Sequence, residues 1–181
     1  MSDRHEVVLD GWLVLKSREG DADAFSRLVA RWQERLWRHA YRRTGSDAAA
    51  WDVVQESWIS ISKGLLRLRD PARFGPWAYS IVTRRAADLT RGREATSSIE
   101  DTPPPLAPPT NPEEDPRVTA LRAIVHELDP EARTLVWLRF VEGYDLARIA
   151  TAMDLPEGTV KSRLHHLKQK LRERLERMND E

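Results

Sequence analysis

Arginines alternate with aromatic residues along the segment RLRDPARFGPWAYSIVTRRAADLTRGR, residues 67–93. Arginine neutralises the phosphates of a nucleic-acid backbone and aromatic rings stack on unpaired bases, so this combination is typical of single-stranded DNA binding. The alternative is that Phe74 and Trp77 belong to a core beneath a solvated arginine face, because tryptophan is usually mostly buried. The candidates for DNA contact are Arg67, Arg69, Arg73, Phe74, Trp77, Arg84, Arg85 and Arg91.

Two segments near the C-terminus predict a helix-turn-helix: LARIATAM, residues 146–153, and a basic helix that begins at Pro156. Asp154 lies in the turn, where a left-handed backbone is needed, and aspartate tolerates that conformation better than most residues. The start of the second helix favours phosphate, and its basic side chains suit phosphates and guanine edges. The alternative is a helical hairpin with a solvated charged face. The candidates for duplex DNA are Glu157, Thr159, Lys161, Ser162, Arg163, His165, His166 and Lys168.

A third candidate interface lies in WDVVQESWISI, residues 51–61, which has the spacing of an amphipathic helix. The predicted buried face consists of Trp51, Val54, Trp58 and Ile61. The opposite face combines polar groups with an exposed isoleucine, which suits a protein partner, although an ordinary solvated face is the alternative. The residues on this second face are Asp52, Gln55, Glu56 and Ile59.

The net charge of zero conceals a strong segregation of charge along the 181 residues. Residues 67–93 hold seven arginines and two acidic residues, and residues 159–177 hold seven basic and two acidic residues. Residues 94–116 hold six acidic and no basic residues. Because local patches decide electrostatic partners, the two basic segments remain candidates for nucleic acid despite the neutral mean.

The elements that must position these residues are predicted to be helices. Apolar residues recur at a spacing of three to four through both halves of the chain. Between the halves, residues 94–116 hold seven of the eleven prolines, which excludes a regular helix and predicts an extended linker. The predicted fold is all-α: a domain over residues 1–93, the acidic linker over 94–116, and a helix-turn-helix domain over 117–181.

The predicted helices have recognisable ends. A short helix is expected around residues 12–15, and a longer one follows Asp21 and ends at Gly45. The next helix is capped near Ser46 and carries the third interface, and another opens at Asp70-Pro71. In the second domain, one helix is expected over 118–128 and one over 130–143 before the helix-turn-helix.

The composition excludes several other classes of protein. With no cysteine there is no disulfide, thiol nucleophile or cysteine-zinc site. No run of 18 apolar residues and no apolar signal core occur, so we expect a cytoplasmic protein without membrane insertion. There is no phosphate-binding glycine loop or serine nucleophile motif, and His165-His166 point in different directions along a helix. We therefore predict no enzymatic activity, cofactor or metal.

Taken together and in order, these segments resemble the extracytoplasmic-function (ECF) group of bacterial RNA polymerase sigma factors. The resemblance rests on GDADAFSRLVARW, DVVQESW, RFGPWAYSIVTRRAADLTR and LDPEARTLVWLRFVEGYDLARIATAMDLPEGTVKSRLHHLKQKLRERL, and it covers roughly residues 11–178. Three positions depart from the family pattern. Arg84 stands where the family often has asparagine, Asp154 stands where it has a turn glycine, and Asp145 stands where serine or threonine is common.

The resemblance implies a sigma factor that binds core RNA polymerase, through its β′ clamp and β subunits, and directs promoter-specific initiation. The DVVQESW helix is then the polymerase-binding element, residues 67–93 read the −10 element as single-stranded DNA, and the last helix reads the −35 element as duplex. The family also implies an inhibitory anti-sigma partner. The alternative is a stand-alone helix-turn-helix regulator whose N-terminal half serves as a sensor or dimerisation domain.

Overall fold

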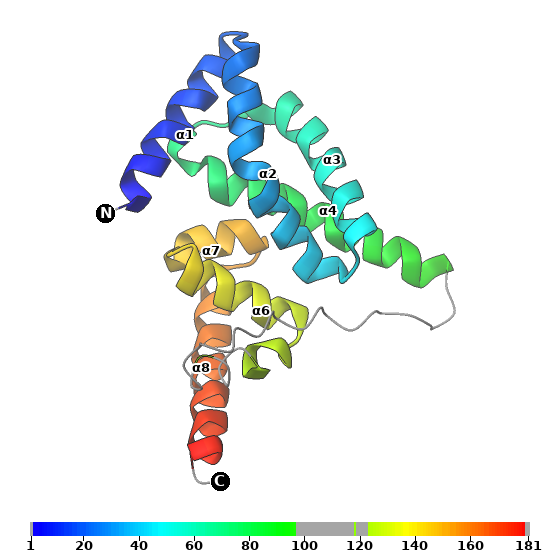
Figure 1. The fold of residues 1–181 in the computed structure, drawn as a ribbon, viewed down its shortest axis with the longest axis vertical. Helices are drawn as coiled ribbons and strands as arrows, with labels where there is room; N and C mark the ends of the chain where they lie inside the picture. The colour runs from blue at the N-terminus through cyan, green and yellow to red at the C-terminus, as the bar shows by residue number, and fades with distance from the viewer. Residues whose placement is uncertain (1, 97–117, 119–122, 180–181) are drawn as a thin grey trace.

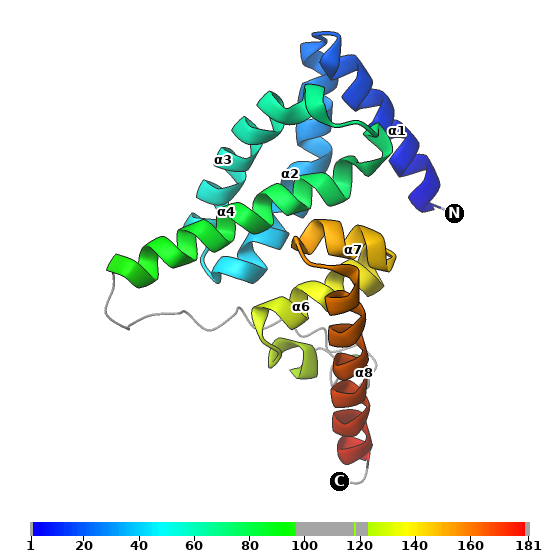
Figure 2. The same cartoon turned by 180° about the vertical axis from the view of Figure 1, so that it is seen from behind.

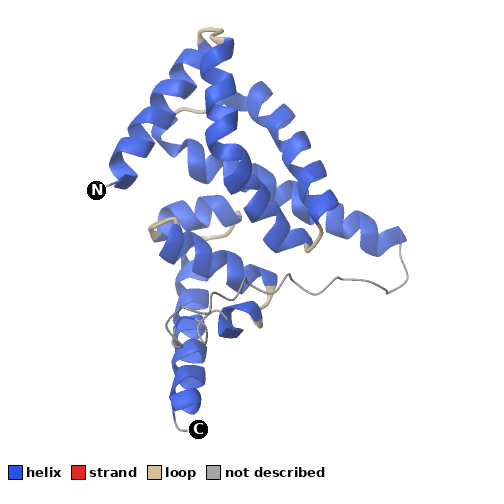
Figure 3. Cartoon of the chain, viewed as in Figure 1, coloured by secondary structure: helices blue, strands red, loops and turns tan. Residues whose placement is uncertain are grey.

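The computed structural model describes residues 2–96, 118 and 123–179, and every regular element in these residues is helical (Figure 3). The first module, residues 2–96, contains α1 (Ser2–Arg18), α2 (Ala22–Thr44), α3 (Asp47–Gly64), the turns η1 (Leu65–Arg67) and η2 (Pro71–Arg73), and α4 (Phe74–Thr96). The second module, residues 123–179, contains α6 (Pro130–Val136), the π-helical turn η3 (Trp137–Val141), α7 (Leu146–Met153) and α8 (Glu157–Asn179). The predicted all-α class is confirmed.

The helix ends follow the capping residues that the sequence offers. Asp21 caps α2 by accepting a hydrogen bond from the Ala24 amide at 2.9 Å, and Gly45 ends the same helix in the left-handed conformation with φ 67°. Ser46 caps α3, and Asp129 caps α6 ahead of Pro130. These local signals therefore set where the chain turns between helices.

Three predicted boundaries are corrected. The first helix is α1, Ser2–Arg18, which is much longer than the short helix expected around residues 12–15. The single helix expected over 130–143 divides into α6 and the wider turn η3. The helix α4 continues to Thr96, so the boundary at residue 93 lies inside it. The rest of the predicted linker, residues 97–116, lies outside the described residues, as does part of the helix expected over 118–128.

The two modules pack directly against each other. In Figures 1 and 2, α7 lies beside α4 and α6 lies near α2, whereas α8 extends away from the first module. A single hydrophobic cluster includes buried residues of both modules, such as Val82 of α4 and Ile149 of α7. The surfaces described below therefore belong to a molecule whose modules are in contact.

Gly75, in the first turn of α4, permits a close approach between the modules. A Cβ atom on Gly75 would lie 2.5 Å from the Cη2 atom of Trp32 and 2.5 Å from the hydroxyl oxygen of Tyr144 in the second module. No ordinary contact is that short, so only glycine fits here without displacing its neighbours.

Candidate polymerase and DNA interfaces

The candidate protein-binding face of α3 is exposed. Its backbone is regular, so residues four apart lie on one side of the helix. Ile59 is 55% exposed, which is unusual for a large apolar side chain. The four residues predicted for this face, Asp52, Gln55, Glu56 and Ile59, are all exposed.

The buried face of α3 differs in part from the expectation. Val54 and Ile61 are buried as predicted, but Trp51 is 36% exposed and Trp58 is only half-buried. Val53 and Ser57 complete the buried side, and the Ser57 hydroxyl donates to the Val53 carbonyl at 2.7 Å. The burial of a serine was missed because its hydroxyl is satisfied within the helix, which removes the usual penalty for burying a polar group.

The arginines of residues 67–93 lie along the outside of α4 and the turns before it. The candidates Arg67, Arg69, Arg73, Arg84, Arg85 and Arg91 are all exposed. At a rise of 1.5 Å per residue, Arg73 and Arg91 are roughly 27 Å apart along the helix. The segment therefore offers an extended basic strip rather than one compact pocket.

The two aromatic candidates in this segment have different environments. Phe74 is fully buried, with its ring in edge contact with Trp32 at a centroid distance of 5.4 Å. The core interpretation therefore holds for Phe74, and its selection as a stacking surface is corrected. Trp77 is half-buried and packs against Phe74 and the backbone of Gly64, which leaves part of its ring at the surface.

Several arginines of the strip have acidic partners. Arg85 pairs with Glu56 of α3 at 3.1 Å and also donates to the Ser60 hydroxyl at 3.0 Å. Arg84 pairs with Asp154 of the second module at 3.1 Å, and Arg91 pairs with Asp88. Residues of the candidate protein-binding face of α3 and of the helix-turn-helix thus contact the candidate −10 strip directly.

The helices α7 and α8 form the predicted helix-turn-helix. Asp145 caps α7 by accepting from the Arg148 amide at 2.8 Å, and Asp154 ends it with φ 57° and ψ 45°. Asp154 is the only non-glycine residue with positive φ in the described chain. The left-handed turn expected of Asp154 is therefore confirmed, and it directs the chain into α8.

The side chains of α8 divide into an inner and an outer set. Val160, Leu164 and Leu167 are buried against the rest of the second module. Arg163 is half-buried and pairs with Glu131 of α6, and the His166 ring Nδ1 lies 2.8 Å from the Ser162 carbonyl. Of the eight candidates, Glu157, Lys161, Ser162, His165, His166 and Lys168 are exposed, whereas Thr159 and Arg163 are half-buried.

Comparisons with known proteins decide the family. The family model Sigma-70 region 2 matches residues 28–96, and Sigma-70, region 4 matches residues 119–171. The chain is 32% identical over 167 residues to the ECF RNA polymerase sigma factor SigE of Mycolicibacterium smegmatis, which covers 87% of this chain and 64% of that protein. The chain belongs to the ECF group of bacterial sigma factors. The resemblance seen in the sequence is confirmed.

A second relative agrees with this assignment, and a solved structure has a similar fold. The sigma factor is 32% identical over 162 residues to the RNA polymerase sigma factor CarQ of Myxococcus xanthus, covering 87% of this chain and 92% of CarQ. Its fold is similar to that of the sigma factor RpoE of Bartonella quintana, solved in complex with the anti-sigma factor NepR, with a TM-score of 0.61 and 18% identity over 84% of this chain and 96% of that chain. Because region 2 matches the first module, the stand-alone regulator is disfavoured.

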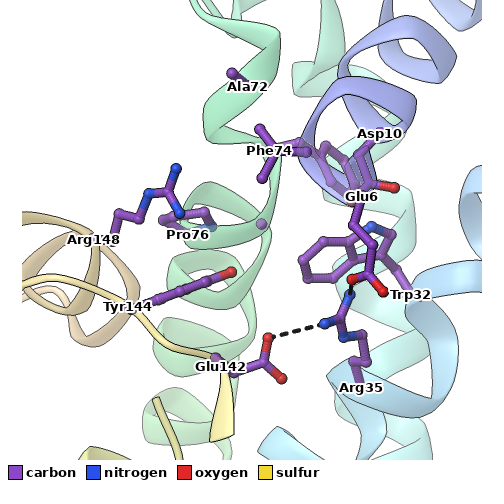
Figure 4. A pocket seen from close by; sticks show the side chains of 12 residues that line it. Glu6, Asp10, Trp32, Arg35, Ala72, Phe74, Pro76, Glu142, Tyr144 and Arg148 are labelled. Atoms are coloured by element: carbon purple, nitrogen blue, oxygen red, sulfur yellow. Dashed lines mark hydrogen bonds and ion pairs between the residues drawn. The ribbon is translucent and has the colours of Figure 1, made fainter. Parts of the chain in front are cut away.

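A buried polar network joins the two modules of the sigma factor. Glu142, which follows η3, accepts hydrogen bonds at Oε1 from the Tyr79 hydroxyl at 3.0 Å and from the Trp137 ring Nε1 at 3.1 Å. Its other oxygen lies 3.3 Å from Nη2 of Arg35 in α2 (Figure 4). Burial, followed by the nearby Glu142 carboxylate, raises the pKa of Tyr79 well above its usual value, so the hydroxyl stays a donor.

A cation–π contact and a small cavity lie beside this network, and both involve residues of the two modules. The guanidinium of Arg42 stacks over the ring of Trp137 at 3.9 Å, and burial lowers the pKa of Arg42 to about 10, which leaves it charged at neutral pH. Beside Glu142, a cavity of about 20 Å³ is lined by residues of both modules, including Glu6, Arg35 and Tyr144 (Figure 4). That volume holds about one water molecule, so the cavity is part of the interface and is too small for a ligand.

A second buried contact joins α2, α4 and α7. The Thr83 hydroxyl donates to the Ala152 carbonyl at 2.8 Å, and the Nε2 atom of His39 lies 2.9 Å from the same hydroxyl. Since the hydroxyl proton goes to Ala152, the His39 Nε2–H donates to the Thr83 oxygen and the ring is neutral. Burial, with the charges of Arg42 and Arg43, lowers the pKa of His39 well below 6.5.

No sequence pattern singled out these inter-module residues. Tyr79, Thr83 and His39 are polar residues on otherwise ordinary helices and Glu142 follows the turn η3, and their partners lie up to 69 positions away. The one available signal was the placement of Thr83 and His39 among apolar positions of their helices. Among the residues that the structure describes, no cluster of ligands for a metal ion occurs, and no helix is long and apolar enough to cross a membrane.

Proposed function

We propose that this sigma factor binds core RNA polymerase through the exposed face of α3 and directs promoter-specific transcription initiation in the cytoplasm, without enzymatic activity of its own. The observation that carries the proposal is the order of the two family matches, region 2 over α2 to α4 and region 4 over α6 to α8. Each match coincides with one of the surfaces that the chemistry of the sequence selected. A two-part surface suits a two-part promoter.

The face of α3 is the proposed contact with the β′ clamp. Its acidic residues Asp52 and Glu56 suit a basic partner, and Ile59 offers an exposed apolar contact at their side. A shallow cleft of about 220 Å³ lies between α3 and α4 and is lined by Asp52, Glu56, Arg85 and their neighbours. Polymerase docking at this cleft would lie next to the −10 strip, because Glu56 pairs with Arg85.

For the −10 element, the proposed contacts are the exposed arginines of the strip together with the surface part of Trp77. The arginines would neutralise the backbone of the melted strand, and the partly exposed ring would stack on an unpaired base. Arg67, Arg69 and Arg73 would contact the strand at one end of α4, and Arg84, Arg85 and Arg91 would contact it along the helix.

For the −35 element, the proposed reader is the first half of α8. Its start at Glu157 points backbone N–H groups at the groove, which favours a phosphate. Lys161 is the proposed phosphate contact, and Ser162 and Arg163 are the proposed base contacts. Arg163 would first have to leave Glu131.

An anti-sigma protein is the proposed regulator, as in the Bartonella quintana complex of RpoE with NepR. The basic strip of α4 and the basic face of α8 give an acidic or amphipathic partner two surfaces to cover. Co-purification of the tagged sigma factor from its native host tests this point. Recovery of the sigma factor free of any stoichiometric partner under every growth condition would contradict it.

The function is tested by run-off transcription with purified core polymerase on genomic DNA fragments. Initiation at specific sites only when the sigma factor is added is the expected result, and no specific initiation from any template would reject the proposal. Gln55→Ala and Glu56→Arg should weaken binding to core polymerase. The matched controls are Gln169→Ala and Glu127→Arg, which change exposed residues of the same types in the second module, and Glu127, like Glu56, pairs with an arginine.

A further inference from the structure

The proposed −10 strip contacts the turn that precedes the proposed −35 reader in the free protein. The guanidinium of Arg84 on α4 faces the carboxylate of Asp154 in the turn between α7 and α8, with Nε 3.1 Å from Oδ2 and Nη2 3.4 Å from Oδ1. Two parallel contacts of this kind resemble the way that arginine binds a phosphate. Asp154 therefore occupies the place on Arg84 that a DNA phosphate would need.

This exposed ion pair lies beside a buried hydrogen bond between the same two elements. Thr83 precedes Arg84, and its hydroxyl donates to the carbonyl of Ala152 in the last turn of α7. The last carbonyls of a helix have no partner within the helix, so Thr83 satisfies a group that would otherwise need water. His39 donates to the Thr83 oxygen from α2 and fixes the hydroxyl in this orientation.

The closed arrangement conflicts with simultaneous reading of both promoter elements. Elements centred near −10 and −35 are roughly 25 base pairs, or about 85 Å, apart along straight duplex DNA. The 23-residue helix α8 is only about 35 Å long, and the turn at its start contacts the −10 strip. The modules must therefore separate before both elements are bound.

We propose that Thr83 and Arg84 of α4, together with Ala152 and Asp154 of the second module, form an intramolecular latch. The latch keeps the free sigma factor closed, and Arg84 exchanges Asp154 for promoter DNA when the latch opens. The DNA-binding part of this inference rests on the proposed function. Arg84 and Asp154 are also two of the three positions at which the sequence departs from the family pattern, and they pair with each other.

The two parts of the latch should contribute unequally. An ion pair as exposed as this one, with side chains 58% and 53% accessible, shifts an equilibrium by no more than about fivefold. Loss of the Thr83 hydroxyl leaves the Ala152 carbonyl without this partner in the closed state, whereas water can satisfy the carbonyl in the open state. Such a loss shifts an equilibrium by about 5- to 150-fold.

The latch can be tested on the full chain by two measurements. The chain has no cysteine, so Ala48→Cys on α3 and Gln169→Cys on α8 provide the two thiols for spin labels, and the label-to-label distance reports closure. The affinity for a single-stranded oligodeoxythymidine reports access to the −10 strip. If the closed state dominates, a change in the closed-to-open ratio changes the DNA affinity by the same factor. If the open state is already populated, the label-to-label distance distribution reports the change in its population.

The expected results differ between variants. Thr83→Val, which changes no charge, should lengthen the distance distribution or raise DNA affinity at least fivefold. Asp154→Asn, which keeps a residue that tolerates the left-handed turn, should act in the same direction by about two- to fivefold. Arg84→Gln should open the molecule without raising DNA affinity, because the same residue is lost as a DNA contact.

The matched control is Asp145→Asn, which removes the same charge from the same module but retains the N-cap of α7. It should match the parent protein in both measurements. If Thr83→Val leaves both the distance distribution and the DNA affinity within twofold of the parent, the latch is rejected. The distance measurement uses no DNA or polymerase, so its outcome is independent of run-off transcription, in which failure would reject the proposed function instead.

Discussion

The outer faces of this sigma factor and the interface between its modules use charged residues in opposite ways. On the outer faces, pairs such as Glu56 with Arg85 are exposed to solvent and can exchange one partner for another at little cost. In the interface, Glu142 is nearly inaccessible and is held by Arg35, Tyr79 and Trp137 at once. Exposed charge on α3, α4 and α8 is therefore available for binding, whereas charge buried in the interface is committed to closure.

The largest expected effect comes from breaking the buried network. Glu142→Ala removes the acceptor of Tyr79 and Trp137 and leaves Arg35 without its buried partner, so it should lower the free energy of unfolding by about 3 kcal/mol or more. Chemical denaturation followed by circular dichroism measures this loss. Glu56→Ala, which breaks an exposed pair, is the control and should cost less than about 1 kcal/mol. Equal losses for the two variants would remove the distinction between the surfaces.

A second effect tests the close approach of the modules. Gly75→Ala places a Cβ atom in contact with Trp32 and Tyr144, and overpacking of this kind should destabilise the protein by about 1–3 kcal/mol. Gly92→Ala in the same helix is the control, because its added Cβ would have no atom within 4 Å. That variant should gain up to about 1 kcal/mol from helix propensity. Thermal unfolding of both variants decides the point, and a neutral Gly75→Ala would contradict the packing.

The pH dependence of stability tests the buried histidine. The pKa of His39 is lowered in the folded state, so the unfolded chain binds a proton below about pH 6.5 that the folded chain does not. Stability from this residue is complete above about pH 6.5 and falls as the pH drops below that value. Denaturation curves between pH 5 and 7 measure the slope. His39→Gln should flatten it, and an unchanged slope would assign the proton to another group.

The smallest effect on stability is expected on the outer face of α8. Lys161→Ala should change the free energy of unfolding by less than about 0.5 kcal/mol, because the side chain is exposed. It should nevertheless weaken binding to all promoters and lower the salt slope of duplex binding by about 1. Ser162→Ala should instead change which promoters are selected. Sequence-dependent loss in Lys161→Ala would exchange the roles proposed for these two residues.

Local structure and the outer faces were predictable because short-range chemistry controls them. Asp21, Ser46 and Asp145 cap helices through hydrogen bonds to residues three positions away, and Asp154 supplies its left-handed turn by itself. The polar side of α3 follows from helical periodicity alone. The same reasoning failed for Phe74, because the spacing of an aromatic residue among arginines does not say which side of α4 meets a neighbour.

The sequence by itself determined the helices, the helix-turn-helix and the residues whose chemistry suits polymerase and DNA. Only the tertiary structure decided that the two modules close on each other. It placed Glu142 against Tyr79, Thr83 against Ala152, and Arg84 against Asp154 across separations of 63 to 70 residues. The physical reason is that periodicity and capping act within a few residues, whereas these pairings depend on how two finished surfaces fit together.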